Sequence, residues 1–239
     1  MKKGKIYSWI VLVILWQIVA MSVQNNILIP YPLEVLETLF GNIQEMIFYQ
    51  TILTTLTRVA IGFFCSFFVA LVISIVSSQF LFFRYLFDPI QVLTKSIPNI
   101  SYIIITLIWF GSEASVSIVC FLVLFPVLYN AFLHALDSEP QELKDIEKIY
   151  PESFLSKTRL STIPMLIPTM LSSGKVAAGL GLKVSVMAEI LGQVRVGIGK
   201  QLYLSRINLD TAGLFAWTMV IIALCFIIDW IFDQFINRT

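Results

Sequence analysis

Charge is scarce in this sequence of 239 residues, since Lys, Arg, Asp and Glu make up 13% of it. A soluble globular domain carries about 25% charged residues. Hydrophobic residues make up 58%, so the composition excludes an ordinary soluble domain. The net charge of +1 gives no indication of nucleic-acid binding, because the sequence has no concentrated basic face and no long Lys/Arg run. We therefore expect a protein that lies in a lipid bilayer and has no nucleic-acid partner.

Cysteine and histidine are also rare. Cys65, Cys120 and Cys225 all lie in apolar runs, where a thiol packs as a small hydrophobe, so no disulfide framework is expected. The single histidine, His134, has no Cys or carboxylate cluster at the spacing of metal ligands. We expect no metal site, and no Ser-His-Asp or Cys-His arrangement points to catalysis.

A phosphate-binding loop is missing as well. GQVRVGIGK, residues 192–200, contains Gly199–Lys200, but Gln201 follows where the Walker A pattern needs Ser or Thr. The chain is therefore expected not to be an enzyme and to bind no cofactor itself. Its glycines instead predict a tight turn or re-entrant bend.

Long hydrophobic runs are abundant. A helix needs about 20 apolar residues to cross a hydrocarbon core of about 30 Å. About six runs approach or exceed that length, near residues 6–25, 49–77, 86–110, 114–135, 165–192 and 211–235. The sequence predicts an all-α integral membrane fold that occupies residues 1–239 as a single transmembrane domain.

Basic residues are distributed unevenly between the expected spans. If the N-terminus is cytoplasmic, the cytoplasmic group comprises Lys2, Lys3, Lys5, Arg84, Lys144, Lys148, Lys157, Arg159 and Arg238. The opposite side has Arg195, Lys200 and Arg206. The positive-inside rule then predicts a multi-pass membrane protein with both termini in the cytoplasm.

The most polar stretch is DIEKIYPESFLSKTRLSTIP, residues 145–164, between the fourth and fifth runs. Pro151 ends one helix and is suited to begin another, in which Phe154 follows. The first of these helices has an apolar face that comprises Leu143, Ile146, Ile149 and Tyr150. The pattern predicts an amphipathic cytoplasmic elbow over about 138–160, which either lies on lipid headgroups or docks on a partner.

The stretch ELKDIEKIYPESFLSKTRLSTIPMLIP, residues 142–168, resembles the cytoplasmic loop of ABC importer permeases of the binding-protein-dependent type. In that family an E-A-A-x-x-x-G segment precedes an apolar-Pro pair. Asp145 stands at the position of the Glu, Ile146 and Glu147 at the two Ala, and Pro151 at the Gly. Three further stretches resemble the sulfonate, taurine and nitrate branch in order and spacing: TLTRVAIGF (55–63), SIPNISYIIITLIWFG (96–111) and KVSVMAEILGQVRVGIG (183–199).

The resemblance implies a type I importer permease fold with a coupling-helix elbow between the fourth and fifth spans. It also implies a second permease subunit, as in a homodimer, two ABC ATPase subunits that bind ATP and Mg²⁺, and an extracytoplasmic solute-binding protein. The implied ATPase-coupling residues are Leu143, Asp145, Ile146, Glu147, Ile149, Tyr150, Pro151 and Phe154.

The function implied by the resemblance is a permease of the bacterial plasma (inner) membrane that forms the solute pathway. The solute would be a small sulfonate-, taurine- or nitrate-like anion, or a molecule like a thiamine precursor. A stand-alone secondary transporter or channel, with the elbow lying on the membrane, is the alternative.

Three ionisable residues fall well inside the expected spans, where a charge costs about 2.5–3.5 kcal/mol on insertion scales. Arg58, with Gly62 close by, matches the family pattern, and we expect both to anchor helices rather than bind solute. Lys183 and Glu189 share the fifth run. Six residues of helix turn them about 120° apart, so each should meet a different neighbour.

Lys183, Met187 and Glu189 are the candidate residues of the translocation pathway. In this hypothesis Lys183 attracts an anionic solute and Glu189 braces the gate. The alternative for Lys183 is a partner group on another helix. Lys175 is expected to snorkel from near a span end, and two acidic residues of the last run are expected to form a solvated or partner-facing pair, Asp229 and Asp233.

Overall fold

The structure is a computed structural model that describes residues 2–138, 156 and 158–237. Every regular element in these residues is helical, which confirms the expected all-α class. The helices are α1 (Lys2–Val23), α2 (Pro32–Ile43), α3 (Met46–Gln79), α4 (Leu81–Ser96), α5 (Asn99–Asp137), η1 (Thr158–Thr162), α8 (Ile163–Gly192), α9 (Ile198–Ile207) and α10 (Thr211–Ile236).

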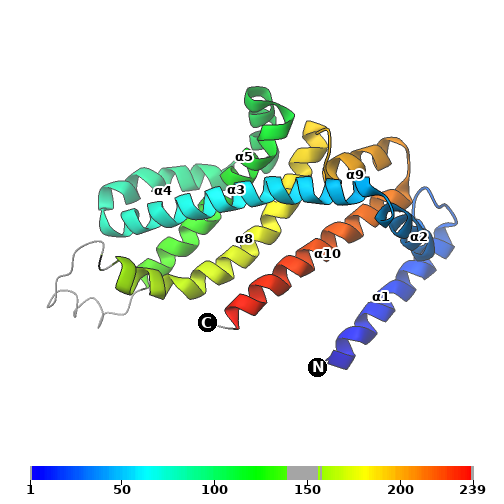
Figure 1. Cartoon of the computed structure of the whole chain (residues 1–239), viewed down its shortest axis with the longest axis horizontal. Coiled ribbons are helices and arrows are strands. Elements are labelled where there is room, and N and C mark those ends of the chain that lie inside the picture. Colours follow the sequence, from blue (N-terminus) through cyan, green and yellow to red (C-terminus); the bar gives the residue numbers. More distant parts are fainter. Residues whose placement is uncertain (1, 139–155, 157, 238–239) are drawn as a thin grey trace.

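Helices α3, α5 and α8 pack against one another to form the core, and α10 lies alongside α8 (Figure 1). The helix α1 lies at the edge of the bundle, with most of its described side chains exposed, and contacts α10 where Trp16 stacks on Phe215. The two chain termini lie toward the same side of the molecule in Figure 1, opposite the connection between α8 and α9. The core therefore consists of three crossing helices, with α10 and α1 arranged beside them.

The buried stripe of α3 explains why this helix packs so closely. Its members recur every three or four residues, which places them on one helical face, and most are small: Thr51, Thr55, Val59, Gly62, Ser66, Ala70 and Ser74. Small residues let two helix backbones approach each other inside a membrane. At the crossing with α5, a Cβ added to Gly62 would lie 2.6 Å from Cys120 Cβ and 2.7 Å from the carbonyl oxygen of Ser117.

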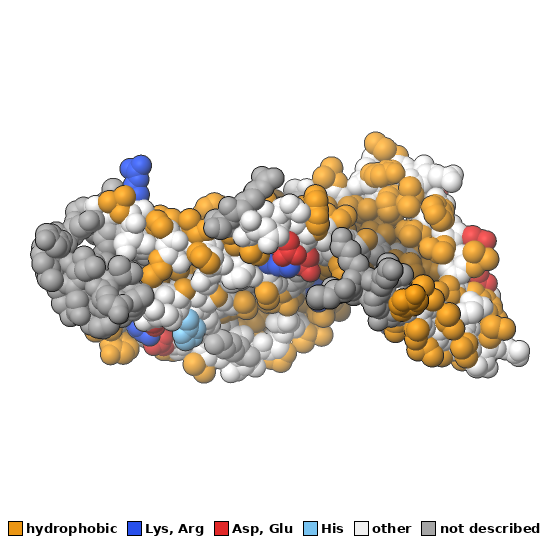
Figure 2. Space-filling view, turned by 90° about the horizontal axis from the view of Figure 1, so that it is seen from below, with side chains coloured by type: hydrophobic (Ala, Val, Ile, Leu, Met, Phe, Trp, Pro, Cys, Tyr) orange, Lys and Arg blue, Asp and Glu red, His pale blue; other side chains and the backbone are white. Residues whose placement is uncertain are grey.

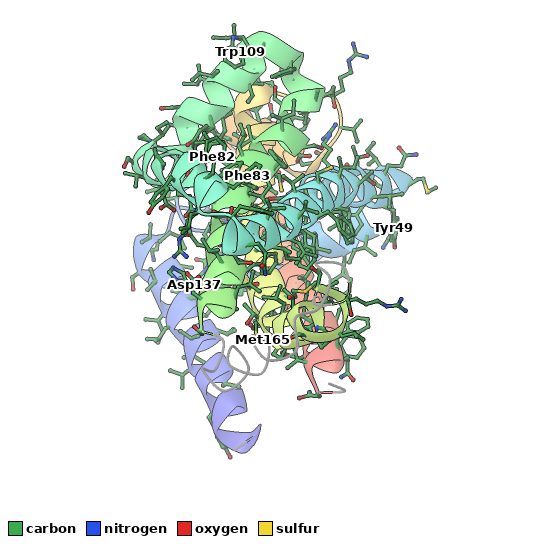
Figure 3. All side chains as sticks on the ribbon, turned by 90° about the vertical axis from the view of Figure 1, so that its left-hand side faces the viewer. Tyr49, Phe82, Phe83, Trp109, Asp137 and Met165 are labelled. Carbon is green, nitrogen blue, oxygen red and sulfur yellow. The ribbon has the colours of Figure 1, made fainter. Side chains whose placement is uncertain are left out.

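A kink divides α5. Gly111 has φ 74° and ψ 176°, a backbone conformation that is rarely adopted by residues with a Cβ. The segment before it turns away, so that Trp109 lies at one extreme of the molecule and Asp137 far from it (Figure 3). The expected run 86–110 is likewise not one helix, because Pro98 is the N-cap of α5 and separates it from α4.

Three helices of the described chain are long and apolar enough to cross a membrane: α3, α5 and α10. α8 has 30 residues, which exceeds the length that a span requires, but it carries Lys175, Lys183 and Glu189. A shorter apolar helical stretch covers Ile10–Val23 in α1. Large hydrophobic side chains are exposed along α1, α3, α4 and α5, and many hydrophobic side chains are visible on the face shown in Figure 2, as expected of a surface that contacts a membrane.

The end of the bundle near η1 carries an ion pair between α4 and α5. Arg84 Nη1 and Nη2 donate to the two carboxylate oxygens of Asp137, at 3.0 and 2.7 Å. The bidentate geometry fixes the two side chains relative to each other. The expected coupling segment begins just beyond this pair. All of its named residues, from Leu143 to Phe154, lie outside the described residues.

We predict that Gly62→Ala destabilises the protein, because the new methyl group would meet the Ser117 carbonyl and Cys120 in the α3–α5 crossing. The expected loss is about 1–3 kcal/mol, as for overpacking of a tight core. Gly179→Ala in α8 is the matched control, since a Cβ there would meet nothing within 4 Å. Thermal unfolding of the detergent-solubilised chain measures both variants, and equal midpoints for the two would contradict the prediction.

Candidate functional site

Four polar side chains from three core helices meet close to the connection between α8 and α9. Thr55 and Arg58 come from α3, Glu113 from α5 and Glu189 from α8. We call them the Arg58 cluster. Arg58 forms ion pairs with both carboxylates, and its Nη1 lies 2.6 Å from Glu189 Oε1. One guanidinium therefore links all three core helices.

Glu189 is 0% exposed, and both oxygens of its carboxylate have hydrogen-bond partners. Besides Arg58, it accepts hydrogen bonds from Thr55 Oγ1 at 3.0 Å and from the backbone N–H of Gly199 at 2.9 Å. Several charge-assisted bonds offset the cost of removing a carboxylate from water. A charge in this place is stable only as long as its partners remain.

The same cluster fixes the connection between α8 and α9. The carbonyl of Val196 accepts a bond from Arg58 Nη1 at 2.8 Å, and the N–H of Ile198 donates to Thr55 Oγ1 at 2.9 Å. The N–H of Arg195 donates to Glu113 Oε1 at 2.9 Å. The turn expected from residues 192–200 is thus confirmed, and its backbone polar groups are satisfied by core side chains.

Two glycines of this turn permit the close approach. A Cβ added to Gly197 would lie 2.6 Å from Glu189 Oε1, and one added to Gly199 would lie 2.4 Å from Glu189 Cβ. These glycines therefore serve contact with a buried carboxylate rather than with a phosphate.

The cluster is a clamp rather than a solute site, because its central groups are shielded. The Arg58 side chain is 11% exposed and that of Glu189 is 0% exposed. Glu113, with 48% of its side chain exposed, lies at the rim. Sequence reasoning singled out Arg58 and Glu189 but missed Glu113 and Thr55. The available signal was that Glu113 is the sole acidic residue between Asp88 and Asp137.

Lys183 and Met187 lie on a different side of α8. Together with Val176 and Leu191 they form an exposed stripe, which we call the open face of α8. The structure separates Lys183 from Glu189, as the 120° rotation predicted. Of the three pathway candidates, Lys183 and Met187 therefore share an accessible surface, whereas Glu189 is buried beside Arg58.

A cavity of about 620 Å³ lies between α3, α8 and α10. It is lined by apolar side chains that include Phe63, Phe67, Met170, Ile228 and Phe232. A charged solute would find no polar partner among these groups, and its desolvation would go uncompensated. The open face of α8, in contrast, carries the ammonium group of Lys183.

The fold and the site define a multi-pass helical membrane protein whose buried charges serve packing. No family model matches the chain. It is 22% identical over 226 residues to the taurine transport system permease protein TauC of Escherichia coli, covering 92% of this chain and 82% of that one. It is 25% identical over 202 residues to the nitrate import permease protein NrtB of Synechocystis, covering 78% and 71%.

A third relative is the formylaminopyrimidine transport permease protein ThiX of Halalkalibacterium halodurans, 24% identical over 220 residues and covering 87% of this chain and 83% of that one. Among solved structures, a chain of the inward-facing MetNI methionine ABC transporter superimposes with a TM-score of 0.70. That match has 14% sequence identity and covers 80% of this chain and 94% of the other, so it shows the fold. The names of these relatives and this fold agree with the resemblance to ABC importer permeases found in the sequence.

We predict that Glu189→Ala lowers stability by about 3–5 kcal/mol, because it leaves the Arg58 guanidinium in a buried place without its main partner. Glu113→Gln at the half-exposed rim should cost about 1 kcal/mol or less. Thermal unfolding of the purified chain compares the two.

The double variant Arg58→Met/Glu189→Leu tests the coupling. It should lose clearly less than the sum of the two single variants, since neither charge is then left alone. Additive losses would contradict a direct ion pair.

Proposed function

We propose that the chain lines the pathway of a bacterial importer with the open face of α8 and pairs there with a second copy of itself. The observation that carries this proposal is that α8 packs on its other sides but leaves Lys183 and Met187 exposed. An ionisable side chain in a membrane helix faces the bundle interior or a water-filled space, not lipid. A pathway between two open faces supplies that space.

The proposed solute is small and carries an anionic group. Lys183 supplies an ammonium on the open face, and the named relatives transport taurine, nitrate or formylaminopyrimidine. An external solute-binding protein would deliver the solute, because the connections on the outer side of this chain are too short to form a solute-capturing domain. The chain would bind no cofactor, and ATP and Mg²⁺ would be bound by two partner ATPases.

Segment 138–160 is the proposed docking element for the ATPases. It follows the end of α5 and leads into η1 and α8, so a displacement there acts directly on two core helices. The Arg84–Asp137 pair at the end of α5 fixes α4 to the same point. The basic residues of this region put it in the cytoplasm by the positive-inside rule, together with both termini.

The Arg58 cluster is the proposed brace at the outer end. Because Arg58 links α3, α5 and α8, those helices would move together when the cytoplasmic end is displaced. Gly62 would contribute by keeping α3 in contact with α5. Glu189 would thus support the gate without touching solute.

We predict that the double variant Ile146→Asp/Ile149→Asp no longer copurifies with the ATPase and loses ATP-driven uptake, because two charges are placed on the apolar docking face. The chain should remain folded and monodisperse. The matched control is Ile207→Asp, at an exposed position at the end of α9, which should retain both properties.

Uptake into vesicles that contain the chain without any ATPase, driven by an ion gradient alone, would refute the importer mechanism and favour a secondary transporter. Reconstituted vesicles with and without the ATPase make this comparison directly.

A further inference from the structure

Helices α8 and α10 pack side by side, and helical periodicity sets a row of three residues on each helix along their interface. On α8 the row is Lys175, Gly179 and Lys183, and on α10 it is Cys225, Asp229 and Asp233. Four residues make slightly more than one helical turn, so the members of each row lie one above another. An ion pair fixes the register at one end, with Lys175 Nζ at 2.6 Å from Asp233 Oδ1.

The register places Asp229 between the two lysines. One turn beyond the ion pair Asp229 comes opposite Gly179, and a second turn brings Cys225 opposite Lys183. The electrostatics agree, since Asp229 acts on Lys175, and both Lys183 and Asp229 act on the Cys225 thiol. In this register the Lys183 ammonium and the Asp229 carboxylate therefore lie about one helical turn apart along the interface between α8 and α10.

Neither of these two groups is satisfied within the part of the chain that the structure describes. No hydrogen bond or ion pair within 4 Å joins Lys183 or Asp229 to another described side chain, in contrast to the Lys175–Asp233 pair. Lys183 is exposed and Asp229 is half-buried. Between them, a Cβ added to Gly179 would meet nothing within 4 Å, so there is open space at this position.

We propose that Lys183 and Asp229 form a subsite for a small zwitterion, with Lys183 binding its sulfonate or carboxylate and Asp229 binding its amino group. This inference rests on the proposed function, because it takes the open face of α8 as part of the solute pathway. A plain anion such as nitrate would satisfy Lys183 but would be repelled by Asp229. An amino-sulfonate or amino-carboxylate satisfies both.

The reactivity of two native cysteines, Cys225 and Cys65, measures whether a solute occupies the subsite. In the intact transporter in lipid nanodiscs, N-ethylmaleimide alkylates accessible thiols, and mass spectrometry of peptides follows Cys225 and Cys65 separately. Taurine should slow the alkylation of Cys225, which lies beside the subsite, and should leave Cys65 on α3 unaffected. The analogue 2-hydroxyethanesulfonate keeps the sulfonate but lacks the amine, and should need about a tenfold higher concentration for the same protection.

Two variants test which group of the solute each charged side chain binds. Asp229→Asn should abolish the preference for taurine over 2-hydroxyethanesulfonate, and Lys183→Gln should abolish protection by both. Asp233→Asn is the matched control, because it breaks the neighbouring ion pair and should keep the preference for taurine.

The subsite is refuted if Cys225 does not react with or without nucleotide, if taurine protects Cys225 and Cys65 equally, or if Asp229→Asn keeps the preference. Any of these results with ATP-driven uptake intact overturns the subsite alone. Loss of the requirement for an ATPase overturns the proposed function instead.

Discussion

The ion pair between Arg58 and Glu189 is the constraint on which the rest of the bundle depends. A carboxylate that is 0% exposed in an apolar bundle is stable only when several donors surround it, and those donors come from α3 and from the turn after α8. Satisfying Glu189 therefore fixes the position of α3 against α8. It also determines where Gly197 and Gly199 must lie, because no side chain fits there.

Small residues and buried charge reinforce each other in this arrangement. The buried stripe of α3 is made of Thr, Ser, Gly and Ala, which bring the backbone of α3 close to α5. The close approach at Gly62 lies one turn from Arg58, and Ser117 donates a hydrogen bond to the Arg58 carbonyl at 3.0 Å. The packing of α3 on α5 positions the Arg58 guanidinium. The guanidinium in turn holds α3, α5 and α8 together at the end of the bundle near the α8–α9 connection. A motion of one core helix would therefore be transmitted to the other two.

Much of this was predictable from the sequence. The hydrophobic runs predicted the all-α membrane class, and the cost of charge in a membrane singled out Arg58 and Glu189. The angle between Lys183 and Glu189 follows from helical geometry alone. The contacts of Glu113 and Thr55 were not predictable, because they depend on how three helices cross. The proline at position 98 could be seen in the sequence to interrupt the third run, but the kink at Gly111 was missed, since a continuous apolar run does not show where its helix bends.

The ionisable residues of α8 divide into two groups according to their partners, and under the proposed function this division would let one helix serve both packing and transport. Glu189 and Lys175 have ion-pair partners on α3 and α10, so they stabilise a fixed arrangement. Lys183 has none among the described residues and lies on the accessible side. Evolution of a purely structural helix would gain stability by replacing such a lysine with an apolar residue, because its insertion is costly. The proposed function accounts for this lysine, because a water-filled pathway would solvate its ammonium group while the Arg58 cluster holds α8 against α3 and α5.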